Sequence, residues 1–154
     1  MMTDRTEETT DQWIDGVRAP AALVLLSYRL IDKYFARELA PHNIGWGPYA
    51  ILMSLYEIDG RTLDGLVKIR RFNKATVTRS VTKLEKEGIA TRKADPKDKE
   101  TIRLFLTKKG KTLEPEMKRV GASITKLLLA GLDEKEAATA LEGVRKIARN
   151  TTKL

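Results

Sequence analysis

The chain has 154 residues, of which 42% are hydrophobic and 32% are charged, a composition typical of one folded domain or one subunit of an assembly. It contains no cysteine, which excludes disulfide bonds, thiolate zinc sites and a cysteine nucleophile. No apolar run approaches the roughly 20 residues of a membrane span. The first residues are polar and acidic, unlike a secretory signal. These exclusions predict a cytoplasmic protein with no membrane partner.

The formal net charge of +8 is concentrated in the middle of the chain. The segment from Arg61 to Lys111 holds 16 basic and 6 acidic residues, whereas the remainder holds 13 basic and 15 acidic residues. Such localised positive charge indicates a polyanion-binding module on a near-neutral scaffold. A membrane-surface role would instead need large apolar side chains opposite the cations, whereas the apolar face of residues 73–87 is narrow and β-branched.

Residues 1–10 are polar and are expected to form a disordered tail. Residues 11–40 follow a helical pattern that is longer than a small core requires, which indicates a dimerisation helix. Pro20 predicts either a kink or a helix that restarts with Pro20 in its first turn. Residues 41–48 are rich in helix breakers and predict a loop. Residues 49–58 are apolar on nearly every side and predict a buried helix.

The next two segments predict a helix-turn-helix. Thr62 is expected to cap a short helix, and a tight connection at residues 70–72 leads to a second helix. Asn73 suits the N-cap of this second helix, and Gly88 suits the left-handed position that ends it. The apolar stripe of the second helix consists of Val77, Val81 and Leu84. Its other face carries hydroxyls and cations, which suit a groove lined by phosphates.

Two short segments after this helix, residues 89–93 and 101–106, alternate like strands and flank a polar loop with Asp95-Pro96 as a turn former. They predict a β-hairpin, or wing, whose tip reaches phosphates or a minor groove. The predicted fold class is therefore mainly α with a small β-hairpin wing. It is a winged helix-turn-helix at residues 45–112, with N- and C-terminal dimerisation helices.

Residues 113–154 are expected to complete the dimerisation region and to form one compact intertwined domain with the rest. A helix capped by Thr107 is predicted to run to about Ala130, with Gly131 at its end. Asp133 and Glu136 form a capping-box pattern at the start of a last helix that reaches about Asn150.

Residues 76–110, TVTRSVTKLEKEGIATRKADPKDKETIRLFLTKKG, resemble the MarR (multiple antibiotic resistance regulator) family of winged-helix transcriptional regulators. The motif residues that carry the resemblance are Leu84, Glu85, Gly88, Arg92, Asp98, Leu106, Thr107 and Gly110. The resemblance implies a homodimer that binds double-stranded DNA. One departure is Glu100, which stands where the family's wing has an arginine that enters the minor groove. Phosphates would repel a carboxylate there.

The candidate DNA-binding residues belong to the wing and to the second helix of the helix-turn-helix, residues 73–88, which is called the reading helix below. On the helix they are Lys74, Thr76, Thr78, Arg79, Ser80, Thr82 and Lys83. On the wing they are Arg92, Lys97, Asp98, Lys99 and Arg103. Arg79 is the leading candidate, and Asp98 is expected to orient wing cations rather than to contact DNA. For Arg79, a solvated or internally paired side chain is the alternative.

The resemblance also implies a pocket for a small aromatic or phenolic effector. The candidates for lining it are Tyr28, Trp46, Tyr49 and Tyr56. Aromatic residues at helical spacing are more often part of a core, and this alternative stays open. His42 is the only histidine, so no histidine-based metal site, and no cofactor, is expected.

The sequence thus predicts a homodimeric, ligand-responsive repressor that binds a pseudo-palindromic operator. The sequence contains no pairing of a nucleophile with a base that would suggest an enzyme. One alternative is a winged-helix module that binds an acidic protein or RNA instead of operator DNA. Another is a small-molecule sensor that binds DNA only weakly.

Overall fold

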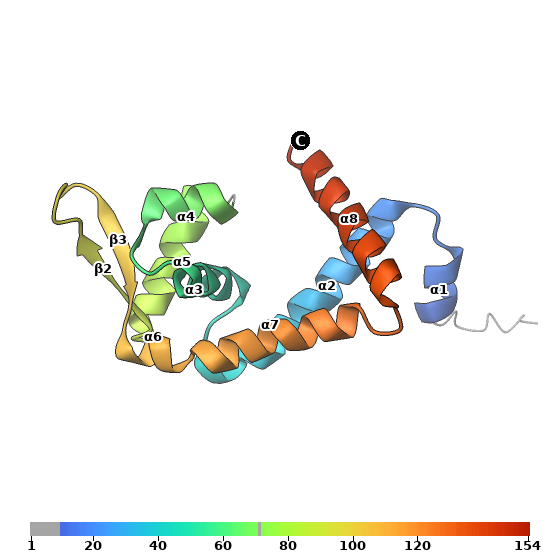
Figure 1. Cartoon of the computed structure of the whole chain (residues 1–154), viewed down its shortest axis with the longest axis horizontal. Helices are drawn as coiled ribbons and strands as arrows, with labels where there is room; N and C mark the ends of the chain where they lie inside the picture. The colour runs from blue at the N-terminus through green and yellow to red at the C-terminus, as the bar shows by residue number, and fades with distance from the viewer. Residues whose placement is uncertain (1–9, 71) are drawn as a thin grey trace, which may run out of the picture. The chain divides into compact units, whose positions relative to one another are not determined.

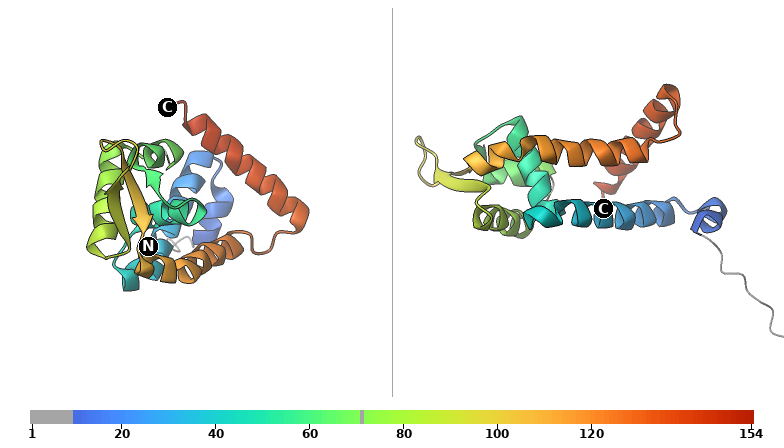
Figure 2. Two further views of the ribbon diagram at one scale, coloured as in Figure 1. Left: turned by 60° about the vertical axis from the view of Figure 1, so that its left-hand side comes forward. Right: turned by 90° about the horizontal axis from the view of Figure 1, so that it is seen from below.

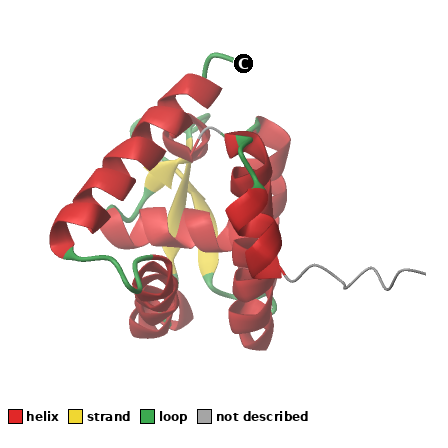
Figure 3. Cartoon of the chain, turned by 90° about the vertical axis from the view of Figure 1, so that its right-hand side faces the viewer, coloured by secondary structure: helices red, strands yellow, loops and turns green. Residues whose placement is uncertain are grey.

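The computed structural model describes residues 10–70 and 72–154, and it divides into two compact units, Met1–Glu114 and Pro115–Leu154. The predicted disordered tail lies outside the described residues, apart from Thr10, which begins the first helix. Helices dominate the fold, and the strands form one small sheet (Figures 1 and 3). Among the described residues, no helix is both long and apolar enough to cross a membrane.

The N-terminal segment forms two helices, α1 (Thr10–Gly16) and α2 (Pro20–Leu39), instead of one. Pro20 occupies the first turn of α2, where its missing N–H leaves no hydrogen bond unmade and its fixed φ suits a helix. The predicted restart at Pro20 is confirmed. A short 3-10 turn, η1 (Ala40–His42), follows α2.

Helix α3 (Trp46–Glu57) is the central element of the first unit. It begins three residues before the predicted start, because Pro48 is tolerated in a first turn that needs no intrahelical N–H donor. Its side chains are buried through most of its length, as predicted, and it packs against α2, α4 and α5. Gly60 ends this region with a φ of +78°.

Strand β1 (Arg61–Thr62) joins the hairpin strands β2 (Ala90–Ala94) and β3 (Ile102–Leu106) in an antiparallel sheet of order β1-β3-β2. The hairpin agrees with the predicted strands to within one residue at each end. Strand β1 is too short for an alternating pattern, so sequence inspection missed it. Its pairing of Arg61 with Leu104 attaches the wing to the start of the helix-turn-helix.

The segment after the sheet is two helices, α6 (Lys108–Thr112) and α7 (Glu114–Leu128), and not the predicted continuous helix. Pro115 explains the break, because a proline inside a helix clashes with the carbonyl four residues earlier and donates no hydrogen bond. The N-cap at Thr107 is confirmed, since its hydroxyl accepts from the Gly110 amide at 3.1 Å.

The second unit contains most of α7 and α8 (Glu134–Thr151). The predicted capping box is present, with Glu136 N donating to Asp133 at 2.8 Å and Asp133 N donating to Glu136 at 2.9 Å. Gly131 adopts a φ of +82° between the two helices. Helix α8 buries none of its residues.

Candidate nucleic-acid interface

The helix-turn-helix consists of α4 (Leu63–Arg70) and α5 (Lys74–Lys86). The hydroxyl of Thr62 accepts from the Gly65 amide at 3.0 Å and so caps α4. The Asn73 side chain accepts from the Thr76 amide at 2.7 Å and caps α5. Both predicted caps are confirmed. They satisfy amides that would otherwise have no partner and thereby define where each helix starts.

Helix α5 ends with a left-handed glycine that directs the chain into the wing. Gly88 has a φ of +68°, and its amide donates to Glu85 O at 2.8 Å. The amide of Ile89 donates to Leu84 O, also at 2.8 Å. These two bonds form a Schellman motif, which satisfies the last carbonyls of the helix. The reading helix and the wing are therefore joined by a defined turn.

The buried stripe of α5 fixes which of its side chains face outward. Val77, Ser80, Val81 and Leu84 are buried, each at most 5% exposed. The exposed side chains on the opposite face are Lys74, Thr78, Arg79 and Thr82. Thr76 is partly exposed, and its hydroxyl lies 3.4 Å from the guanidinium of Arg79. A polar, cationic surface therefore runs along the helix.

The prediction that Ser80 lies on the exposed face is wrong. Ser80 stands three residues after Val77 and four before Leu84, which places it within the apolar stripe at helical spacing. It lies against Gly47 of α3, where an added Cβ would come within 2.7 Å of the Ser80 hydroxyl oxygen. Ser80 thus contributes to close helix packing.

Lys83 belongs to a cluster at the end of α5. Its ammonium lies 3.0 Å from the Glu87 carboxylate, and the Asn43 amide donates to the same carboxylate at 2.7 Å. The Lys83 hydrogen bond is the leading cause that lowers the pKa of Glu87. The positive charge of Lys83 is therefore locally offset, and its neighbours hold the helix end to the loop after η1.

The wing places Arg92 and Arg103 in internal ion pairs. Arg92 pairs with Glu85 of α5 at 2.6 Å. Arg103 pairs with Asp95 at the start of the wing loop and donates to Gly60 O at 2.9 Å. Figure 2 shows the hairpin beside α5, with its loop extending past the helices. Both arginines thus anchor the wing through internal ion pairs, which the sequence did not predict.

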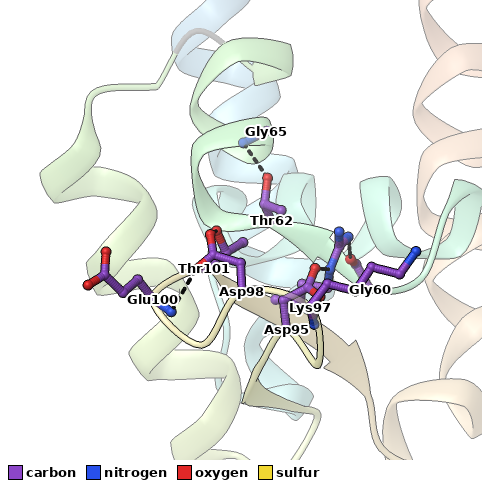
Figure 4. A network of polar contacts seen from close by, with 9 residues as sticks. Gly60, Thr62, Gly65, Asp95, Lys97, Asp98, Glu100 and Thr101 are labelled. Carbon is purple, nitrogen blue, oxygen red and sulfur yellow. Dashed lines mark hydrogen bonds and ion pairs between the residues drawn. The ribbon is translucent and has the colours of Figure 1, made fainter.

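Asp98 does not orient a cation, contrary to the prediction; Asp95 does. The carboxylate of Asp98 accepts from the Thr101 hydroxyl at 2.6 Å and from the Glu100 amide at 3.1 Å, so it shapes the turn (Figure 4). The Thr101 hydroxyl is the leading cause that lowers the pKa of Asp98. Lys97 and Lys99 are exposed at the tip of the wing.

The candidate effector residues do not form one group. Trp46 and Tyr49 lie together, with ring centroids 5.7 Å apart, and Phe35 packs 4.7 Å from Trp46. Tyr49 is 4% exposed and belongs to the core, whereas Trp46 is 44% exposed. Tyr28 is exposed on α2. The hydroxyl of Tyr56 donates to Gly110 O at 2.8 Å, and burial raises its pKa.

Sequence inspection missed Glu85 and Asp95 as residues that hold the reading helix and the wing in place. Glu85 contacts Arg92 seven residues away and Asp95 contacts Arg103 eight residues away, each across a turn, and no periodicity within one element signals such a pairing. Among the described residues, no group of histidine and acidic side chains could hold a metal ion.

A capped helix, a second helix with an exposed cationic face and a hairpin anchored at its end define a winged helix-turn-helix DNA-binding protein. A sequence profile of the MarR family matches residues 46–101. YybA of Bacillus subtilis, an uncharacterized HTH-type transcriptional regulator, is 30% identical over 115 residues, which cover 73% of this chain and 77% of YybA.

Solved structures agree with this assignment. A MarR transcriptional regulator from Methanosarcina mazei is 31% identical, with a TM-score of 0.77 over 86% of this chain and 96% of that one. A MarR family regulator from Listeria monocytogenes, in complex with 26mer DNA, is 25% identical, with a TM-score of 0.78 over 87% and 89% of the two chains. The chain belongs to the MarR family of DNA-binding transcriptional regulators.

Proposed function

We propose that this chain is a homodimeric repressor that binds a pseudo-palindromic operator. Helix α5 of each subunit would read the major groove while the wing reaches neighbouring phosphates or the minor groove. The observation that carries the proposal is the exposed face of α5. Lys74, Thr78, Arg79 and Thr82 are exposed along one helix that is capped at its start and joined to the wing at its end.

Exposed apolar side chains support the dimer. Leu141, Val144 and Ile147 of α8 are 48%, 61% and 43% exposed, and they recur every three residues. Helix α2 exposes a second set, Val24, Leu25, Tyr28 and Leu30. Exposed apolar helix faces of this kind are typical of a protein–protein interface. In a two-fold dimer, the two reading helices would address half-sites about one helical turn apart, roughly 34–36 Å.

The operator is tested by selecting bound fragments from the source organism's own genome, with the region upstream of this gene included. A repressor is expected to enrich a few fragments that share an inverted repeat, and reporter expression from them should rise when the gene is deleted. Excess non-specific duplex DNA serves as the control in a gel shift. Loss of the complex at low excess competitor would contradict operator recognition, and falling expression in the deletion strain would indicate an activator.

The dimer is tested by Val144→Asp, with Thr139→Asp as the matched control. Val144 lies on the apolar face of α8, whereas Thr139 is exposed on the opposite side of the same helix. Burying an unpaired carboxylate in an interface is strongly unfavourable. Sedimentation analysis should find a monomer for Val144→Asp and a dimer for Thr139→Asp. A dimer in both variants would show that this face is not the interface.

The response to a small aromatic or phenolic effector is part of the same proposal. It is supported by the exposed ring of Trp46 beside Phe35 and Tyr49. A panel of aromatic acids and phenols should contain a compound that raises the melting temperature, quenches tryptophan emission and weakens the DNA complex. Trp46→Ala should abolish all three effects. An effector that acts equally on this variant would bind elsewhere.

A further inference from the structure

The tip of the wing is not a cationic patch. Residues 95–101 contain two lysines and three acidic residues. Asp95 is paired with Arg103, and Asp98 accepts hydrogen bonds from within the turn. The remaining carboxylate, Glu100, has no hydrogen-bond or ion-pair partner among the residues that the structure describes. It is therefore available to whatever the wing approaches.

The backbone at Glu100 is held by a network of hydrogen bonds. Its own amide donates to Asp98 at 3.1 Å, and the following amide, of Thr101, donates to Asp98 O at 2.9 Å. The Thr101 carbonyl in turn accepts from the Asp95 amide at 2.8 Å. Figure 4 shows the Glu100 side chain extending away from these contacts. The turn thus fixes the backbone from which the Glu100 side chain extends.

Glu100 also lines a hollow of about 250 Å³ between the wing and the helix-turn-helix. The other sides of this hollow include Lys74 at the start of α5 and Asp64 in the first turn of α4. With α5 in the major groove and the wing at the adjacent minor groove, the strand that separates the two grooves would pass here. Glu100 would then stand at the edge of the minor groove.

A carboxylate at the minor groove discriminates between base pairs in one direction. An A·T pair presents only acceptors there, whereas a G·C pair adds the N2 amino group of guanine, the one donor. An ionised carboxylate can only accept, so it favours guanine. A·T tracts also narrow the minor groove and deepen its negative potential, which repels a carboxylate. The base contact and the effect of groove shape therefore both favour G·C pairs.

We propose that Glu100 is a specificity-determining residue that makes the wing favour G·C over A·T pairs in the minor groove beside each half-site. The inference rests on the proposed operator binding and adds a base preference outside the positions read by α5. A good base contact changes affinity by roughly 5- to 150-fold. We expect a preference of about tenfold, since the guanine amino group offers a single contact rather than a bidentate pair.

The test is selection from a random duplex library with the full-length protein, followed by binding measurements on selected duplexes that carry G·C or A·T flanks. The wild type should prefer the G·C flanks, and Glu100→Gln should bind both about equally. The matched control is Asp64→Asn, which removes a carboxylate from the same hollow but not from the wing. It should raise affinity for both duplexes and leave their ratio unchanged.

Equal flank ratios for the wild type and Glu100→Gln would overturn the inference, even if the variant bound both duplexes more tightly. That result would mean that Glu100 only weakens DNA binding, by repelling phosphates equally on all sequences. The same data separate this failure from failure of the proposed function. If the wild type enriches no inverted repeat at all, operator recognition itself is wrong.

Discussion

The guanidinium of Arg92 in β2 lies 2.6 Å from the carboxylate of Glu85 in the last turn of α5. The backbone amide of Arg92 donates to the other oxygen of that carboxylate at 3.0 Å. The side-chain hydrogen bond between them lowers the pKa of Glu85 and raises that of Arg92. This pair joins the wing to α5, so we expect it to set the angle at which the two elements would meet DNA.

Arg92→Ala should change DNA binding more than stability. The two side chains are 36% and 29% exposed, and solvent screens such pairs, so unfolding free energy should fall by less than about 1 kcal/mol. Operator affinity should fall several-fold because the angle between wing and helix is no longer held. Urea unfolding and a binding isotherm measure the two effects.

Arg92→Lys distinguishes positioning from simple attraction to phosphates. Lysine keeps the charge but lacks the planar fork that binds a carboxylate at two points. If Arg92 acts by positioning, the lysine variant should bind DNA almost as weakly as the alanine variant. Full recovery of affinity in Arg92→Lys would mean that only the charge matters.

Acidification should weaken the fold through the carboxylates that hold the wing. Hydrogen bonds lower the pKa of Glu85, Asp95 and Asp98 in the folded state. Such groups stabilise the fold above the ordinary carboxyl pKa of about 4, and this stability is lost as pH falls through the lowered folded values. Urea unfolding between about pH 7 and pH 3 should show a plateau and then a decline. Asp98→Asn should flatten part of that decline, and an unchanged slope would exclude Asp98 as a contributor.

Arg79 and Lys99 should affect DNA binding in different ways. Arg79 is exposed on the reading helix, so Arg79→Ala should lower operator affinity by roughly 1–3 kcal/mol and flatten base preference. Lys99 is exposed at the wing tip, so Lys99→Ala should weaken binding about equally on all sequences. Isotherms on operator and scrambled duplexes measure both changes. Unaltered binding in either variant would remove that side chain from the interface.

Val81→Asp should unfold the helix-turn-helix. Val81 is fully buried, and an unpaired carboxylate there would cost several kcal/mol. Thr82→Asp is the matched control, because the side chain of Thr82 follows Val81 in α5 and is exposed. The control should melt cooperatively, as the wild type does, while losing DNA affinity. A cooperative, wild-type-like melt of Val81→Asp would refute the assigned buried face.

Operator binding should depend steeply on salt. If the dimer neutralises about 6–10 phosphates, counterion release predicts that affinity falls by roughly 10³–10⁵ between about 50 and 200 mM salt. A series of isotherms at increasing salt gives the slope. Three of the candidate cations, Lys83, Arg92 and Arg103, are internally paired. We therefore expect the fall in affinity to lie near the lower end of this range. A binding constant that hardly varies with salt would exclude phosphate contacts as the main source of affinity.

The sequence by itself determined the local structure of this protein. Capping residues at Thr62, Asn73, Thr107 and Asp133 marked where helices begin, because each side chain satisfies an amide within its own turn. The glycine at position 88 marked a helix end for an equally local reason. The alternation at residues 102–106 predicted the wing. The break before α7 is also local, because Pro115 is compatible with the first turn of a helix but not with its interior.

Only the tertiary structure decided which charged side chains are available to DNA. The sequence predicts Arg92 and Arg103 as DNA-binding cations of the wing. In the structure each pairs with a carboxylate across a turn, seven residues away for Arg92 and eight for Arg103. The burial of Ser80 against Gly47 differs from these pairings, because the spacing of Ser80 to Val77 and Leu84 already places it on the buried face. Ion pairs between elements depend on how those elements meet in space, and they leave no periodic trace along the chain.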